Sequence, residues 1–433
     1  MLSSFKNMFR IPDLRKKILF TIFIVAAYRF GAHIPVPGVS IEALKQIQAQ
    51  RSDQGVVALL DLFSGGALTN FSLFALGIMP YITSSIIMQL LGVVIPKLEQ
   101  WREEGETGQK KITQWTRYLT VALAVMQSAG ISYLAHTGQL FGQLGTAGGA
   151  DIKLIPVWTA PRIAIVVLTL TAGTAMVMWL GELITQRGIG NGMSILIFAS
   201  IISRLPYQGA AVYRAGMPKF ITILALLVGM VVAIIFVDQG QRRIPVQFAK
   251  RVVGRKMMGG NTTYIPLKVN SAGVIPIIFA SSILYFPTLI ATTLPWEGFR
   301  DWVNRYLANQ GSVVYMGLYF SLIIFFAYFY TAIQFDPVRQ AEMIKKQGGF
   351  IPGIRPGKST AEYFDHILTR ITLPGSIYLG VIALIPSIVF AVWKISNIPF
   401  GGASMLIVVG VALETMKQIE SQLMMRNYEG FLS

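Results

Sequence analysis

The chain has 433 residues, of which 53% are hydrophobic and only 13% are charged, and its formal net charge is +17. A water-soluble protein carries about 25% charged residues, so this composition indicates a protein whose solvent is largely lipid. The chain has no cysteine, which excludes disulfides and thiol nucleophiles. Its three histidines, His33, His136 and His366, are scattered, which argues against a metal site, and we expect no cofactor.

Apolar runs of roughly 20 residues recur along the chain, long enough to cross a hydrocarbon core of about 30 Å. The predicted spans are 18–34, 73–95, 117–136, 160–183, 193–206, 219–238, 271–293, 313–334, 371–393 and 401–423. The first span follows basic residues, as a signal peptide would, but it is too long and no small-residue cleavage site follows it. We interpret it as a retained helix. The sequence therefore predicts an all-α, polytopic membrane protein of ten transmembrane helices.

The basic residues predict the orientation of the chain. With the N-terminus inside, 26 of the 37 lysines and arginines fall in inner segments, ten fall in outer ones, and Arg29 lies in the first helix. Short inner loops of membrane proteins carry the excess of positive charge, so both termini are predicted to be cytoplasmic.

Two inner loops, 239–270 and 335–370, are long and basic. Gly348-Gly349 and Pro352-Gly353 in the second loop are typical of turns, and both loops are predicted to project as hairpins. Their charge has two interpretations: it orients the chain and attracts anionic lipid, or it forms a docking surface for a partner. The pattern alone leaves both open.

Short segments repeat between the two halves of the chain, 1–206 and 207–433. Helix two contains Gly77-Ile78-Met79-Pro80 and helix seven contains Gly273-Val274-Ile275-Pro276, while helices five and ten open with Gly192-Met193-Ser194 and Gly402-Ala403-Ser404. Because each half has an odd number of spans, two halves of the same fold must be inverted across the membrane. Helices interrupted by glycine and proline at matching positions of inverted repeats indicate a functional site near the middle of the membrane.

Polar side chains cluster on helices two, three and seven. They could serve ordinary packing between helices through small residues. A wetted interior, or a seam that can part, better explains their clustering on helices two, three and seven. The residues are Thr83, Ser84, Ser85, Gln89, Gln127, Ser128, Ser281 and Ser282.

Four isoleucines occupy matching positions in the repeats: Ile82, Ile197, Ile278 and Ile407. Each one alone is typical of a core or lipid-facing residue. As symmetry mates on four helices, they are predicted to converge into an apolar constriction, which blocks ions because it resists wetting.

The outer segment before helix two, Asp61–Ser72, is too short to span and contains Gly65-Gly66. We predict a short helix that returns part-way into the membrane from outside, where protein or water surrounds it.

Acidic residues are scarce inside the spans, which disfavours a proton relay. Glu182, Asp238 and Asp336 lie at cytoplasmic ends, and for the two interior charges, Arg29 and Glu414, snorkelling or a structural ion pair is expected. The glycine-rich segment 187–192 lacks the Lys-Ser/Thr of a phosphate loop and is interpreted as a tight turn. No catalytic constellation is found, so we expect a protein that is not an enzyme.

Four segments resemble the SecY family, the channel subunits of the bacterial protein translocase, and the resemblance covers essentially the whole chain. They are Asp61–Ser72 continuing into Phe74–Ile82, the Arg187–Gly192 turn, Asn270–Pro276 and Phe350–Gly357. The resemblance implies a clamshell of two inverted five-helix halves around an hourglass pore, with a lateral gate between helices two and three on one side and seven and eight on the other.

The resemblance also implies roles for individual residues. The pore ring would be Ile82, Ile86, Met193, Ile197, Val274, Ile278 and Ile407. The plug would be Asp61, Leu62, Phe63, Ser64, Gly65, Gly66, Ala67, Leu68, Thr69 and Asn70. Asn270 would join the polar residues above in the lateral gate. Met193 stands where a branched aliphatic residue is common, which implies a slightly softer ring because methionine is unbranched.

In the family, the basic loops bind the ribosome or the motor ATPase SecA, and small subunits of the SecE and SecG type accompany the channel. The docking residues implied here are Arg242, Arg243, Arg255, Lys256, Arg355 and Lys358. Lys256 replaces a usual arginine and loses its bidentate geometry. The implied function is a passive conduit in the bacterial cell membrane, which signal sequences open and through which unfolded polypeptides pass or leave sideways into lipid.

Two other functions fit parts of the sequence. A secondary transporter with inverted repeats would need an essential intramembrane acid, for which Glu414 is the candidate. A non-conducting scaffold would only recruit ribosomes through its basic loops.

Overall fold

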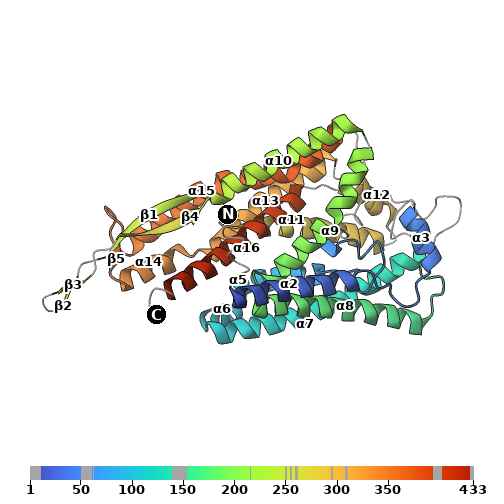
Figure 1. Cartoon of the computed structure of the whole chain (residues 1–433), viewed down its shortest axis with the longest axis horizontal. Helices are drawn as coiled ribbons and strands as arrows, with labels where there is room; N and C mark the ends of the chain where they lie inside the picture. The colour runs from blue at the N-terminus through green and yellow to red at the C-terminus, as the bar shows by residue number, and fades with distance from the viewer. Residues whose placement is uncertain are drawn as a thin grey trace.

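The structure is a computed structural model that describes residues 11–49, 61, 63–138, 154–214, 216–248, 251–253, 256–258, 262–293, 296–307, 311–393 and 402–429. The described part is an elongated bundle of helices from which a β-hairpin projects at one end (Figure 1).

Each of the ten predicted spans coincides with a helix. These helices are α2 (Pro12–Gly31), α5 (Met79–Val94), α7 (Glu106–Thr137), α8 (Ala160–Arg187), α9 (Gly192–Arg214), α10 (Met217–Gln239), α11 (Ile275–Thr293), α13 (Val313–Gln334), α15 (Lys358–Trp393) and α16 (Gly402–Glu429). By length and composition alone, six helices of the described residues could cross a membrane, or seven if α5 and the following α6 (Pro96–Glu103), bent by 100°, form one span. The apolar parts of α9 and α11 are shorter, at 10–17 residues.

Pro80 and Pro276 were expected to interrupt helices two and seven, and the structure corrects this expectation, although Pro287 does lie inside α11. The predicted span 73–95 becomes helical only at Met79, so Pro80 is the second residue of α5. Pro276 likewise is the second residue of α11. Proline has no backbone N–H to donate and its φ suits the first turn, so at these positions it begins a helix and frees no carbonyl within it.

Two helices extend well beyond their predicted spans. α7 begins at Glu106 and α15 begins at Lys358, so much of each loop that precedes the predicted span is helical. Hydropathy marks only the part of a helix that lies in hydrocarbon, and a helix with a polar end continues into water without penalty.

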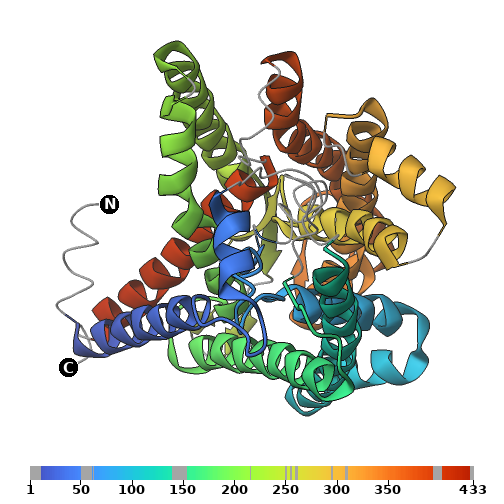
Figure 2. The same cartoon turned by 90° about the vertical axis from the view of Figure 1, so that its right-hand side faces the viewer.

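The helices form two groups. In the first group α7 packs against α5 and α8, and α2 packs against α8 and α9. In the second group α13 packs against α11 and α15, while α16 packs against α10 and α15. The groups meet where α9 contacts α10 and α16, and where α11 contacts α5 and α7. Figure 2 shows α2 and α8 side by side along the lower edge of the bundle.

Backbone geometry supports the repeat between the two halves. Gly77 and Gly273 both have a left-handed φ, +56° and +62°, and each lies three residues before the proline of its helix. Only glycine adopts this region without strain, so the same turn leads into both helices.

Close contacts of other glycines repeat in the same way. A Cβ on Gly173 of α8 would meet the carbonyl oxygen of Leu73, four residues before Gly77. A Cβ on Gly375 of α15 would meet the carbonyl oxygen of Val269, four residues before Gly273. In both halves, therefore, the segment that leads into this turn crosses a face of the fourth helix at a glycine.

The two basic loops form one small domain at the end of the bundle. β1 (Gln241–Phe248) pairs antiparallel with β4 (Thr262–Lys268), and β2 (Arg251–Val253) pairs with β3 (Lys256–Met258) beyond them. The predicted hairpin at 239–270 is therefore present. The loop at 335–370 instead folds as α14 (Pro337–Lys346), β5 (Gly349–Phe350) and the start of α15, and β5 pairs with β1 to give the strand order β4-β1-β5.

A buried apolar core fixes this small domain. Ile244 and Val246 on β1, Ile344 on α14 and Phe364 on α15 pack together, and each is at most 7% exposed. At the opposite end of the bundle lie two short helices, α3 (Ile41–Ala49) and α12 (Glu297–Tyr306) (Figure 1).

Candidate functional site

The seven residues expected to form a pore ring lie in one contiguous apolar cluster. Ile82, Ile86, Ile197, Ile278 and Ile407 are at most 9% exposed, and Met193 and Val274 pack against this cluster. They come from α5, α9, α11 and α16, and Val274 is the residue directly before α11. These are the two pairs of helices that match between the repeats. The same cluster also contains residues of α2, α10, α12, α13 and α15, so a ring formed by these seven residues stays a prediction.

Close glycine contacts hold the edges of this cluster. A Cβ on Gly181 of α8 would come within 2.5 Å of the Met193 sulfur, and a Cβ on Gly410 of α16 would come within 2.8 Å of the Val274 Cγ1. The neighbouring helices therefore leave no room for larger side chains behind these two residues. An apolar cluster of this kind offers water and ions no hydrogen-bond partner, and its chemical capacity is to seal.

The expected plug segment is buried in the same region. Among its described residues Phe63, Ala67 and Leu68 are at most 2% exposed, and Phe63 and Ala67 belong to the apolar cluster that contains the ring isoleucines. Leu62 lies outside the described residues. The segment is a set of tight turns with a single helical stretch at its start, and Gly65 and Gly66 supply its left-handed positions.

Asp61 organises the plug segment from inside. Its carboxylate accepts hydrogen bonds from the Thr69 backbone N–H at 3.1 Å, from the Thr69 hydroxyl, and from the Ser64 hydroxyl at 3.3 Å. The Ser64 hydroxyl oxygen in turn accepts from the Leu68 N–H at 3.2 Å. These bonds fold the segment onto its first residue.

Side chains from α2 and α9 hold the segment from outside. Arg204 of α9 forms an ion pair with Asp61 at 3.1 Å, with only 6% and 2% of the two side chains exposed. Arg29 of α2 donates to the Gly65 carbonyl at 2.8 Å, and Tyr28 shares a 2.8 Å hydrogen bond with Ser200 of α9. For Arg29 the expectation was snorkelling or an ion pair, and it instead donates to the backbone of the expected plug segment.

Sequence reasoning missed Tyr28, Ser200 and Arg204. Arg204 was counted among the outer basic residues because it lies near the end of an apolar run. An arginine at that depth was a usable signal, since buried arginine needs an acidic partner. The partner itself could not be identified, because Asp61 and Arg204 meet only in the folded chain.

The expected gate residues divide into two groups. Ser84 of α5 donates to the Thr116 carbonyl of α7 at 2.7 Å, and Ser128 of α7 shares a 3.3 Å hydrogen bond with Thr171 of α8. Both contacts lie within the first group of helices, which is the small-residue packing that the sequence also allowed. A role of these two serines in a gate stays a prediction.

The remaining gate residues either lie where the two halves meet or form hydrogen bonds within their own helix. Ser281 and Ser282 of α11 both donate to the Ile278 carbonyl of their own helix, at 2.9 and 2.8 Å, and Gln89 donates to Ser85 at 3.4 Å. Thr83 and Gln127 are buried, and Asn270 is half-buried before α11. α11 contacts α5 and α7, so the two halves touch along the expected seam, and its role as a gate stays a prediction.

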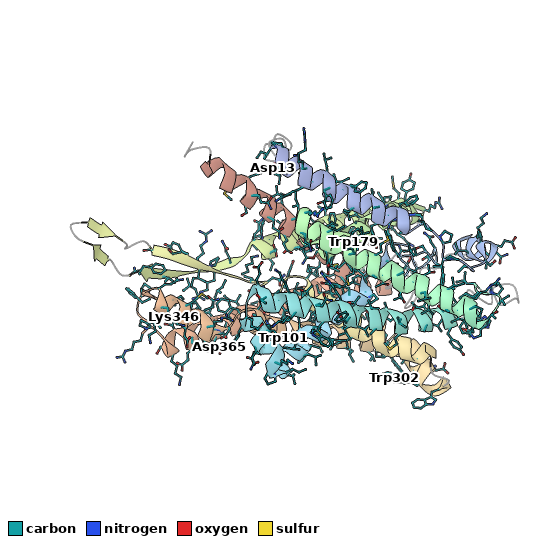
Figure 3. The ribbon with its side chains drawn as sticks, turned by 90° about the horizontal axis from the view of Figure 1, so that it is seen from below. Asp13, Trp101, Trp179, Trp302, Lys346 and Asp365 are labelled. Carbon is teal, nitrogen blue, oxygen red and sulfur yellow. The ribbon has the colours of Figure 1, made fainter. Side chains whose placement is uncertain are left out.

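The expected docking residues lie on the small domain. Four of them have exposed side chains: Arg242 and Arg243 on β1, Arg355 in the turn before α15, and Lys358 at the start of α15. Lys358 forms only a solvent-exposed ion pair with Glu362 at 3.9 Å. Lys256 is in β3, and Arg255 lies outside the described residues. Figure 3 places Lys346 at this basic end and Trp302 at the far end of the molecule.

Within the part of the chain that the structure describes, no group of three or more His, Asp or Glu side chains could hold a metal ion.

Comparisons with known proteins agree with this architecture. The SecY family model matches residues 72–416. The chain is 53% identical over 440 residues to the protein translocase subunit SecY of Streptomyces galbus and 51% identical over 450 residues to that of Mycobacterium bovis, in both cases over 100% of each chain.

Solved structures share the fold at lower identity. A protein-conducting channel has a TM-score of 0.60 and 17% identity, and Sec61 from a canine ribosome-channel complex has a TM-score of 0.57 and 15% identity, each covering 94% of this chain and 92% of the other. The fold is thus the polytopic helical clamshell of these channels, and the chain spans the full length of its relatives. The chain belongs to the SecY family.

Proposed function

We propose that this chain is the pore-forming subunit of a Sec-type protein translocase. The observation that carries the proposal is that four helices, matched in pairs between two inverted halves, bring seven apolar side chains into one cluster with a buried plug segment. Membership of the SecY family supports the same function.

In the resting state the ring and the plug close the pore. The apolar ring resists wetting, so it blocks ions without a charged gate, and its unbranched Met193 makes it deformable around a passing chain. A hydrophobic signal sequence enters between α5 and α11, where the two halves touch. An apolar segment of about 20 residues then leaves sideways into lipid, and polar segments continue outward through the ring.

The energy for movement comes from a partner. The exposed basic residues of the small domain offer a surface to the ribosome or to a motor ATPase of the SecA type, and small subunits of the SecE and SecG type complete the assembly. No nucleotide-binding or catalytic motif was found in the sequence, so the chain itself acts as a passive channel rather than an enzyme. The excess of basic residues in the inner segments supports a bacterial plasma membrane location with both termini in the cytoplasm.

The proposal also divides the chain into two halves at the connection between α9 and α10, whereas the boundary expected from the sequence, 206/207, falls inside α9. α9 runs through Pro206 to Arg214, and α10 begins at Met217. Gly216, which precedes α10, has φ +119°, a conformation suited to glycine. A hinge between the halves therefore fits the short connection between these two helices.

Site-specific crosslinking tests the pore. A photoreactive side chain at Ile82 or Ile278 is expected to crosslink to a polypeptide stalled during translocation. The matched control is Phe236 of α10, which is 81% exposed and is expected to crosslink to lipid. If both isoleucines crosslink only to lipid while a stalled chain is present, the proposal is wrong.

A further inference from the structure

The inference concerns the buried ion pair between Asp61, the first residue of the expected plug, and Arg204 of α9. Their closest atoms, Oδ2 and Nη2, are 3.1 Å apart, and the side chains are 2% and 6% exposed. Buried charges are rare in proteins and need a partner. This pair is also the only ion pair, among the described residues, in which both side chains are less than a tenth exposed.

The pair links two networks. On one side, Asp61 accepts hydrogen bonds from Ser64 and Thr69, which fold the plug segment. On the other side, Arg204 belongs to α9, the helix that carries Met193 and Ile197 of the ring. The ion pair therefore joins the hydrogen-bond network of the expected plug to the helix that carries two of the expected ring residues.

The apolar side chains of the plug cannot supply this specificity alone. Phe63, Ala67 and Leu68 are buried, but apolar contact is non-directional and permits partial displacement. An ion pair in a low-dielectric site behaves differently, since separating its charges leaves both uncompensated until water enters. We accordingly expect the plug segment to have two states, one fully bound and one fully displaced.

We propose that the Asp61–Arg204 pair is a latch that determines substrate specificity by setting how hydrophobic a signal sequence must be to open the channel. The proposal rests on the proposed function. A strongly hydrophobic segment entering between α5 and α11 gains enough free energy to separate the pair, whereas a weak one does not. Arg29 holds the same segment by donating to the Gly65 carbonyl.

A double-mutant cycle tests the latch. The variants are Asp61→Asn, Arg204→Gln and the double variant, each assembled as the complete complex in membrane vesicles. Translocation is measured for one substrate carrying a graded series of signal sequences, and ion leak is measured without substrate. Arg214→Gln, an exposed position at the end of the same helix, is the matched control.

Each single variant is expected to translocate substrates with weaker signals than the wild type accepts. Each should also raise the ion leak by about a hundredfold, since one charge stays buried without its ion-pair partner. The double variant removes both charges and is expected to lie closer to the wild type than either single variant. Arg214→Gln is expected to match the wild type.

Unchanged signal thresholds in both single variants, or purely additive effects in the double variant, would overturn the latch. Substrates with the strongest signals separate this outcome from failure of the proposed function, because the wild type must translocate them if the chain is a channel. If Asp61→Asn does not accumulate in the membrane, Arg204→Lys replaces it. This variant keeps a positive charge but loses the planar fork, and an intermediate threshold is expected.

Discussion

Arg117 of α7 and Glu182 of α8 form a bidentate pair, with the Arg117 Nε 2.8 Å from one carboxylate oxygen and Nη2 2.7 Å from the other. The side chains are 37% and 16% exposed, so the pair is partly screened by solvent. It joins two helices that also pack along their length. Glu182, an acidic residue expected only to mark a cytoplasmic end, thus helps to fix the first half as a rigid unit.

Arg117→Ala is expected to lower the free energy of unfolding by about 1–2 kcal/mol, between the values for exposed and buried pairs. Arg117→Lys should lose part of this amount, because lysine cannot bind both oxygens in one plane. Thermal unfolding of the detergent-solubilised protein measures both. The control is Lys111→Ala. Lys111 forms an ion pair with Glu104, and because these side chains are 47% and 42% exposed, the pair is expected to contribute little. Equal losses at Arg117 and Lys111 would contradict the assignment.

Gly192 and Gly402 begin the two matched helices α9 and α16, and each touches the preceding span. A Cβ would come within 1.8 Å of the Gly181 carbonyl oxygen in the first case and within 2.2 Å of the Ile382 carbonyl oxygen in the second. These are backbone atoms that cannot rotate away. Gly192→Ala and Gly402→Ala are each expected to destabilise the protein by about 1–3 kcal/mol, because the helices must move apart.

Gly229→Ala in α10 is the matched control, since nothing lies within 4 Å of a Cβ there. It is expected to be neutral or to stabilise by up to about 1 kcal/mol through helix propensity. The same thermal unfolding measurement serves all three variants. A loss confined to one of the two matched glycines would argue against equivalent packing in the two halves.

Phe364 of α15 is fully buried in the core that joins the two basic loops. Phe364→Ala is expected to cost about 3–5 kcal/mol of local stability, because it leaves a cavity under β1 and α14. Hydrogen exchange of the β1 amides should become faster, and limited proteolysis should cut the β1/β4 hairpin sooner. Tyr264→Ala on β4, whose side chain is 56% exposed, should leave both measurements nearly unchanged. Protection of β1 in the Phe364 variant would show that the two loops are independent.

Arg355 has an exposed side chain, while its carbonyl accepts a 2.9 Å hydrogen bond from the Thr360 hydroxyl. Arg355→Glu should therefore preserve the turn and change only the charge presented to a partner. Affinity for ribosomes or for a SecA-type ATPase is expected to fall by about tenfold or more, with a weaker salt dependence. Sedimentation with vesicles containing the complex measures this binding. Arg305→Glu on α12, at the opposite end of the molecule, should bind like the wild type, and equal losses at both positions would refute a specific docking surface.

Local chemistry in the sequence determined much of the fold. Ten apolar runs specified ten helices because each must satisfy its own backbone within hydrocarbon. Gly77 and Gly273 revealed the repeat because a left-handed turn requires glycine, and the structure gives both the same conformation. The helix ends were less well predicted: α7 and α15 continue past their apolar parts, and Pro80 and Pro276 begin helices rather than interrupting them.

Only the tertiary structure decided which polar groups meet. Ser84 and Ser128 form hydrogen bonds within their own half of the chain. β5 pairs with β1, which joins the two loops, and Arg204 forms an ion pair with Asp61. Each of these contacts joins residues from different elements, so its existence depends on how the elements pack and not on any local pattern. The matched isoleucines could be recognised in the sequence because symmetry repeats them. The buried ion pair has no such repeat, and the folded chain alone brings its two charges together.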